Sequence, residues 1–126
     1  MSEIFNPKTS DFNLDLSYLK DVSSGSSEFM IEMIDLFLAQ TPEYFENLAQ
    51  FIKDENWVKV GELAHKIKPT LAFMGADSAK ESMVEIENKA RNLIDTESIS
   101  ASFKELHDFS AILFKKLKEV RKELED

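Results

Sequence analysis

The sequence predicts an all-α protein, an antiparallel up-down four-helix bundle with an additional short N-terminal helix. Apolar residues recur at steps of three, four and seven through most of the chain, which is the period of amphipathic helices. With Gly 3 and Pro 3 in 126 residues, the chain is poor in turn residues, which disfavours β architecture. The connections between long segments of similar length are short, and this forces neighbouring helices to run antiparallel.

The chain has the size of a single domain. Its 126 residues, 43% of them hydrophobic, can fill one core but not two. No internal repeat, low-complexity tract or linker divides it. We expect a polar lead over residues 1–13 and one bundle domain over residues 14–126.

The first two helices are separated by a serine-rich break. A short helix is expected over residues 15–22, followed by the run 23–27, whose last serine, Ser27, is expected to cap the second helix. Pro42 should bend or interrupt this second helix near its middle. Its apolar positions are Met30, Ile31, Ile34, Phe37, Leu38, Phe45, Leu48 and Ile52.

Three further helices follow a break at residues 53–56. Gly75 suits the C-terminal cap of the third helix and Asp77 the N-cap of the fourth, so the turn between them is tight. The third helix places Trp57, Val60, Ala64, Ile67, Leu71 and Met74 on one face, and the fourth Ala79, Met83, Ile86, Ala90 and Leu93 or Ile94. The fifth runs from about Ile99 to Glu123, with Phe103, Leu106, Leu113, Leu117, Val120 and Leu124.

Charge and composition exclude several classes of partner. The 15 basic and 24 acidic residues give a net charge of −9, the wrong sign for nucleic acid or an anionic membrane. The absence of cysteine removes disulfides and thiolate chemistry. No apolar run approaches the roughly 20 residues that cross a bilayer, and the first residues lack a signal-peptide pattern. We expect a soluble cytoplasmic domain.

His65 lies off the apolar stripe of the third helix. At about 100° per residue it points roughly 130° away from the stripe, so we expect it to face water. On the same outward side, the residues four before, four after and seven after it are the compact Gly61, Pro69 and Ala72. Lys66 and Lys68 add local positive charge.

Two of these neighbours weaken the helix that carries His65. An exposed histidine on a helix is more often an ordinary surface residue. Gly61 and Pro69 favour another interpretation, because relative to alanine an interior glycine costs roughly 1 kcal/mol and a proline about 3 kcal/mol. We interpret the cleared surface as room for another macromolecule to approach the imidazole. Pro69 is also expected to kink the helix.

The residues around His65 match a known family. The run 64–76, AHKIKPTLAFMGA, resembles the signature of histidine-containing phosphotransfer (HPt) domains, and the run 37–43 and Asn56-Trp57 are also similar to the family. The resemblance implies that His65 accepts a phosphoryl group and that Lys68 helps to hold it. The resemblance also implies that the residues that donate the phosphoryl group to His65 and accept it from His65 are aspartates of receiver domains. Pro69 departs from the family, which most often has glycine there.

Glu87 has two open interpretations. In many HPt domains a glutamine or glutamate 22 residues after the histidine hydrogen-bonds the imidazole, and Glu87 occupies that position. Helical spacing places it roughly 70° from the centre of its helix's apolar stripe, from where it could reach the third helix. Alternatively, it forms a surface salt bridge with Lys80 or Arg91.

The resemblance also implies partners and cofactors. The partners are response-regulator receiver domains and hybrid sensor histidine kinases, and a monomer is expected. Three glycines, at 25, 61 and 75, cannot form a nucleotide-binding loop, so we expect no autonomous kinase activity and no cofactor, with Mg²⁺ supplied by the receiver. The candidate docking residues are Val58, Gly61, Lys66, Pro69, Ala72 and Phe73. Phe73 could instead pack on the N-terminal helix.

The sequence also has features of two rival functions. Glu62 and His65 form an E-x-x-H sequence, as in di-iron bundles, but such sites need two of these motifs, and the other histidine, His107, has Lys104 at −3. His107 belongs to no motif and is predicted to be dispensable. A non-transferring adaptor that only binds receivers stays open.

Overall fold

Residues 14–125 are the part of the chain that the computed structural model describes, and helices make up most of it. The elements in chain order are α1 (Ser17–Val22), α2 (Ser27–Lys53), α3 (Trp57–Phe73), α4 (Asp77–Asn92), the short 3₁₀ helix η2 (Thr96–Ser98) and α5 (Ile99–Glu125). The polar lead expected over residues 1–13 lies outside the described residues, as does Asp126.

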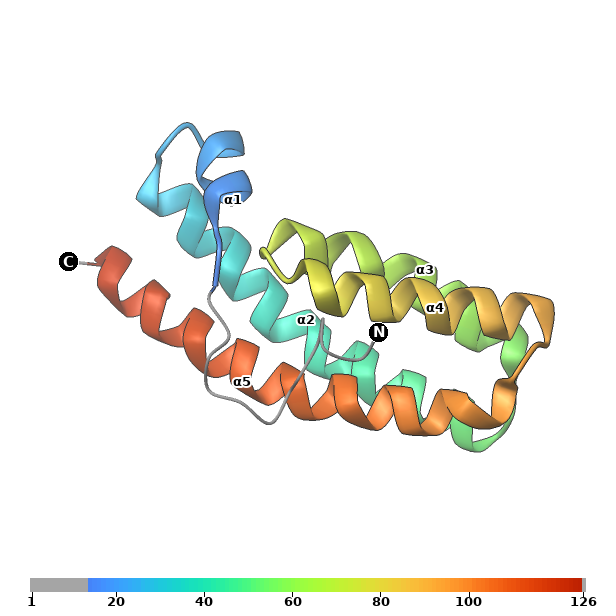
Figure 1. Cartoon of the computed structure of the whole chain (residues 1–126). Helices are drawn as coiled ribbons and strands as arrows, with labels where there is room; N and C mark the ends of the chain where they lie inside the picture. The colour runs from blue at the N-terminus through green and yellow to red at the C-terminus, as the bar shows by residue number, and fades with distance from the viewer. Residues whose placement is uncertain (1–13, 126) are drawn as a thin grey trace.

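The four long helices alternate in direction around a common core, as predicted (Figure 1). α2 packs against α3 and α5, and α4 packs against the same two helices, which closes the bundle. The largest fully buried side chains come from all five α-helices and the turn after α3: Phe45, Leu19, Ile34, Leu48, Ile67, Leu71, Met74, Met83, Ile86, Ile99, Leu106 and Leu113. The periodic apolar positions of the sequence therefore form one core.

Neither internal proline interrupts its helix. α2 runs unbroken through Pro42 and α3 runs unbroken through Pro69. Of the two outcomes expected at Pro42, a bend or an interruption, the interruption is therefore wrong. Each proline removes one main-chain hydrogen bond. Phe37 and Phe45 are buried on either side of Pro42. Core packing on both sides of the proline offsets the lost bond.

Helix starts differ from the predicted caps by one residue. The hydroxyl of Ser26, rather than Ser27, accepts the N–H of Phe29 at 3.2 Å and caps α2. Ala76 occupies the N-cap position of α4, so Asp77 is the first helical residue and not the cap. Asp77 still suits this place, because its negative charge lies in the first turn near the positive end of the helix dipole.

Gly75 fixes the turn between α3 and α4 and also the position of α1. Its φ of +76° is a conformation that favours glycine. A Cβ at Gly75 would lie 1.8 Å from the main-chain oxygen of Asp15, so the segment leading into α1 crosses directly over this turn. Leu19 of α1 is fully buried in the core. α1 is therefore anchored at the end of the α3–α4 hairpin.

The end of α4 departs from the sequence pattern. Leu93 adopts a left-handed conformation with φ +53°, and the helix ends at Asn92. Leu93 and Ile94 are 68% and 62% exposed, so neither continues the apolar face as expected. α5 extends to Glu125, two residues beyond the expected end. Among residues 14–125, no helix has both the length and the apolar character to span a membrane.

Candidate functional site

The site is built around one buried carboxylate between α3 and α4. The side chain of Glu87 is only 7% exposed and contacts three cationic or titratable side chains. Its Oε2 lies 2.9 Å from Nδ1 of His65 and accepts a hydrogen bond from Nε of Arg91 at 2.9 Å. Its Oε1 accepts a hydrogen bond from Nζ of Lys68 at 2.7 Å. Glu87 therefore makes the contact with the imidazole that one interpretation predicts and also an ion pair that the other predicts. The partner in that ion pair is Arg91, not Lys80.

The pKa of Glu87 keeps this carboxylate charged. Burial raises the pKa, but the hydrogen bond and charge of Lys68, followed by those of His65, outweigh burial and lower it below the ordinary value of 4.5. An ionised carboxylate can only accept hydrogen bonds. The proton between Glu87 and His65 therefore resides on Nδ1.

Glu87 orients the imidazole of His65 through Nδ1 and leaves Nε2 without a hydrogen bond to residues 14–125. In the neutral imidazole that donates from Nδ1 to Glu87, Nε2 carries the lone pair. The side chain is 62% exposed, as helical spacing predicts. Within residues 14–125 no hydrogen-bond partner contacts Nε2. A neutral, outward-facing ring nitrogen of this kind is a nucleophile.

Gly61 lies beneath the side chain of Arg91. The sequence places Gly61 on the exposed side of α3, but the residue is buried. An added Cβ would lie 2.9 Å from Cγ of Arg91 and 3.6 Å from its Nε. The missing side chain therefore gives Arg91 room to cross from α4 over α3. This corrects the predicted exposure of Gly61, and any contact it makes with a partner remains a prediction.

Sequence reasoning gave Arg91 no role at the histidine. The sequence offers Arg91 only as one of two possible salt-bridge partners of Glu87. The available signal was its position four residues after Glu87, a spacing that places two side chains on the same helix face. The contact with Gly61 links residues 30 positions apart, and helical periodicity carries no information about such a pair.

The other residues proposed for docking differ in exposure. Val58 is 70% exposed, and Lys66 and Pro69 are also exposed. Nζ of Lys66 lies 5.1 Å from the ring centre of Tyr44, which is a cation–π contact. Within residues 14–125, Lys66 forms no ion pair with a carboxylate. Ala72 is half-buried.

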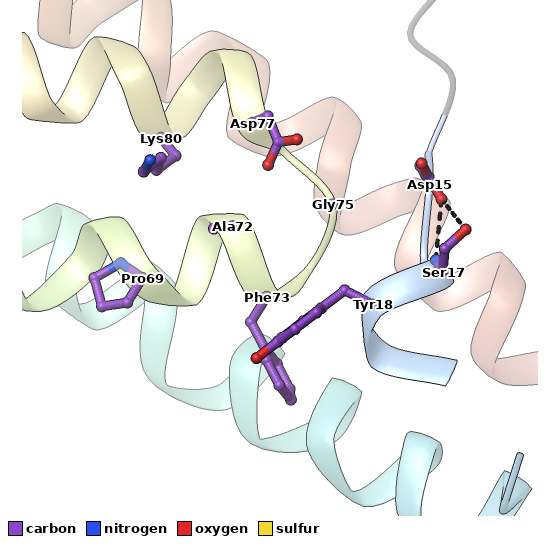
Figure 2. A pocket seen from close by; sticks show the side chains of 9 residues that line it. All are labelled: Asp15, Ser17, Tyr18, Pro69, Ala72, Phe73, Gly75, Asp77 and Lys80. Atoms are coloured by element: carbon purple, nitrogen blue, oxygen red, sulfur yellow. Dashed lines mark hydrogen bonds between the residues drawn. The ribbon is translucent and has the colours of Figure 1, made fainter. Parts of the chain in front are cut away.

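Phe73 packs on the N-terminal helix, one of the two alternatives left open by the sequence. Its ring meets Tyr18 of α1 edge-to-face at 5.5 Å between centres. Figure 2 shows the two rings in contact where α1 approaches the end of α3. The ring is half-buried, so part of it still faces solvent.

An open groove of about 660 Å³ lies between α1, the end of α3 and the start of α4 (Figure 2). Pro69, Ala72 and Phe73 line it from α3, Tyr18 from α1, and Asp77 and Lys80 from α4. Three of the residues proposed for docking thus share one concave surface. Pro69 lies one helical turn after His65, which places the groove beside the imidazole.

The rival metal motif does not form a cluster in the described structure. Glu62 pairs with Lys59 at 3.7 Å on the surface of α3. The ring of His107, on α5, lies 5.9 Å from that of Phe103 and 6.2 Å from that of Phe45. Among residues 14–125, no group of three or more histidine, aspartate or glutamate side chains could hold a metal ion.

Comparison with known proteins identifies the family of the chain. A family model for the Hpt domain matches residues 32–126, and the chain therefore belongs to the Hpt domain family. This membership implies a histidine phosphotransfer role in a phosphorelay, and Hpt domains interact there with receiver domains and histidine kinases. No curated protein and no solved structure matches the chain. The family match begins inside α2, so α1 precedes it.

Proposed function

We propose that the protein is a phosphorelay intermediate that accepts a phosphoryl group on His65 from a receiver-domain aspartate and passes it to another receiver aspartate. One observation carries this proposal. The imidazole of His65 is 62% exposed while Glu87 holds its Nδ1 at 2.9 Å, which leaves Nε2 directed away from the carboxylate. An oriented, accessible nucleophile is what transfer between two proteins requires.

The first transfer forms a nitrogen–phosphorus bond. The lone pair of Nε2 attacks the phosphorus of an aspartyl phosphate, the bond from phosphorus to the aspartate oxygen breaks, and its electron pair leaves with the carboxylate. Nδ1 keeps its proton, so the ring gains positive charge. Glu87 accepts the hydrogen bond from Nδ1 and stabilises that charge. In the second transfer, an aspartate oxygen attacks phosphorus and the electron pair of the N–P bond returns to Nε2.

Lys68 supplies positive charge for the phosphoryl oxygens. Its Nζ binds the same carboxylate as the imidazole, one turn along α3, and its side chain is 26% exposed. A lysine ammonium group acts as a point charge that suits the negative charge developing during transfer. We propose that Lys68 moves from Glu87 toward the phosphoryl group when that group arrives.

The proposed partners are receiver domains and hybrid sensor histidine kinases in the cytoplasm. The receiver supplies Mg²⁺, and this chain, which has no nucleotide-binding loop in its sequence, contributes no kinase activity of its own. We propose that it acts as a monomer and binds neither nucleic acid nor membrane. The positive charge of Lys66 and the groove at Pro69, Ala72 and Phe73 support docking of a partner beside His65. Val58 and Gly61 remain proposed contacts on the same helix.

Incubation with a phosphorylated receiver domain tests this function. The wild-type chain should acquire a label that is lost in acid and stable in base, as a phosphoramidate bond is, and His65→Gln should acquire none. His107→Gln is the matched control, because the second histidine lies on α5, and it should be labelled as the wild type is. Label retained in His65→Gln would contradict the proposal. Receiver binding without any label in the wild type would favour the non-transferring adaptor.

A further inference from the structure

Arg91 and the imidazole of His65 share a single oxygen atom. Nε of Arg91 and Nδ1 of His65 each lie 2.9 Å from Oε2 of Glu87. The Arg91 side chain is 49% exposed, so the remaining N–H groups of its guanidinium can reach other acceptors near the ring. The guanidinium is therefore a second cation beside the histidine, next to Lys68.

The resting site holds more positive than negative charge. Glu87 carries one negative charge, whereas Lys68 and Arg91 carry two positive charges. Within residues 14–125, neither cation pairs with any other carboxylate. This excess is notable in a chain with a net charge of −9. An added phosphoryl group would bring the negative charge that the cluster lacks, and an arginine fork is well suited to its oxygens.

We propose that Arg91 is a second phosphoryl-binding residue, held by Glu87 in the resting protein, and that Gly61 is glycine because any side chain there would displace it. This rests on the proposed transfer to His65. When Nε2 becomes phosphorylated, the guanidinium turns from Oε2 to the phosphoryl oxygens, while Glu87 keeps the hydrogen bond from Nδ1. No covalent step is added to the transfer. Gly61 serves the site through Arg91 and is a positioning residue.

Direct observation of Arg91 tests the exchange of partners. The protein is phosphorylated with phosphoramidate, which transfers its phosphoryl group to Nε2 and releases ammonia, and the ¹⁵N resonance of Arg91 Nε is followed by NMR. The resonance should shift in the wild type and stay unchanged in His65→Gln treated in the same way. A phosphorylated protein whose Arg91 resonance does not move would overturn the proposal. A protein that takes no phosphoryl group on His65 would instead contradict the proposed function.

A double-mutant comparison tests the link between Gly61 and Arg91. Arg91→Ala should slow transfer from a phosphorylated receiver by on the order of tenfold, and Gly61→Ala should slow it by several-fold while the helix remains folded. Combining the two should be no slower than Arg91→Ala alone. Lys104→Ala, which removes a similar charge from an exposed position on α5, should transfer at the wild-type rate.

The conservative variant separates the phosphoryl contact from simple packing. Arg91→Lys keeps the positive charge and should restore part of the rate lost in Arg91→Ala, whereas Arg91→Met, which keeps much of the packing but no charge, should not. Equal rates for Gly61→Ala and wild type, or effects that multiply in the double variant, would overturn the assignment of Gly61. No recovery in Arg91→Lys would overturn the assignment of Arg91 as a phosphoryl-binding cation.

Discussion

Glu87 contacts His65 and Lys68, which the sequence assigns to the site, and also Arg91, to which the sequence assigns no role at the histidine. The resemblance to HPt domains offered a hydrogen bond between this position and the imidazole as one of two interpretations, and Glu87 makes this hydrogen bond. Its burial to 7% exposure and its simultaneous contacts with Lys68 and Arg91 depend on how α3 and α4 approach each other. Periodicity within one helix gives the direction of a side chain but not the distance to the neighbouring helix.

The lowered pKa of Glu87 predicts a pH dependence of folding. Because its folded-state pKa lies below the ordinary 4.5, ionised Glu87 contributes stability that is present above about pH 4.5 and is lost as the pH falls through the folded-state value. In Glu87→Gln this contribution should disappear. Urea unfolding at about pH 7 and about pH 3 measures it.

The comparison with Glu87→Gln isolates this one group. Asp15 and Asp35 also have lowered pKa values, through Ser17 and Arg121 respectively, and titrate in the same range in both proteins. The wild type should therefore lose more free energy of unfolding than the variant does between the two pH values. Equal losses would show that Glu87 is not the titrating group assigned here.

Replacing Lys68 should separate chemistry from folding. Lys68→Ala removes the ammonium group 2.7 Å from Glu87 and should slow transfer by roughly 10- to 100-fold, because negative charge on the phosphoryl oxygens loses a partner. The helix should remain, since alanine is the best helix former. Rapid-mixing transfer kinetics and circular dichroism measure the two effects. Lys118→Ala, on the exposed surface of α5, is the control, and unchanged kinetics in Lys68→Ala would remove its assigned role.

Helices were easier to predict from this sequence than their ends. Each of the long helices carries an apolar face at regular spacing, and this is a local signal that survives an internal proline. Caps depend on individual main-chain angles, and the predicted caps of α2 and α4 are therefore off by one residue. The contact of Asp15 with Gly75 joins segments 60 positions apart, and only the folded structure reveals it.

This contact predicts unequal effects at two glycines with nearly the same conformation. Gly75 has φ +76° and Gly25 has φ +78°, so alanine at either position is strained by the backbone. Only at Gly75 would the new Cβ also meet the main chain of Asp15, whereas nothing lies within 4 Å of it at Gly25. Gly75→Ala should lower the free energy of unfolding by about 1–3 kcal/mol, and Gly25→Ala by about 1 kcal/mol.

Chemical denaturation of both glycine variants measures this difference. Hydrogen exchange should also show weaker protection of the amides of α1 in Gly75→Ala, because the segment leading into that helix must move away from the turn. Equal losses of stability in the two variants would mean that the Asp15 contact does not anchor α1.

The bundle as a unit shows why the fold could be predicted more completely than the site. Closure of the four helices follows from many repeated apolar positions, so an error at one of them, such as Leu93, leaves the architecture unchanged. The site depends on single contacts between α3 and α4. Helical spacing singled out His65, and the resemblance to HPt domains supplied its role and those of Lys68 and Glu87, whereas the pairing of Gly61 with Arg91 required the packed helices.

The arrangement of charge over the surface is also informative. The chain is acidic, with a net charge of −9, yet Lys68 and Arg91 lie beside the exposed imidazole with a single carboxylate between them. Local positive charge attracts an anionic phosphoryl group, while the acidic remainder disfavours nucleic acid. This local charge supports the proposed docking of a phosphorylated partner at this face of α3 and α4.

The identity of the phosphorylated atom tests the central claim most directly. After incubation of ¹⁵N-labelled protein with a phosphorylated receiver, NMR coupling between ³¹P and ¹⁵N reports which nitrogen carries phosphorus. We predict coupling to Nε2 of His65, with the proton retained on Nδ1 beside Glu87. Coupling to Nδ1, or phosphorus on any other residue, would contradict the proposed site.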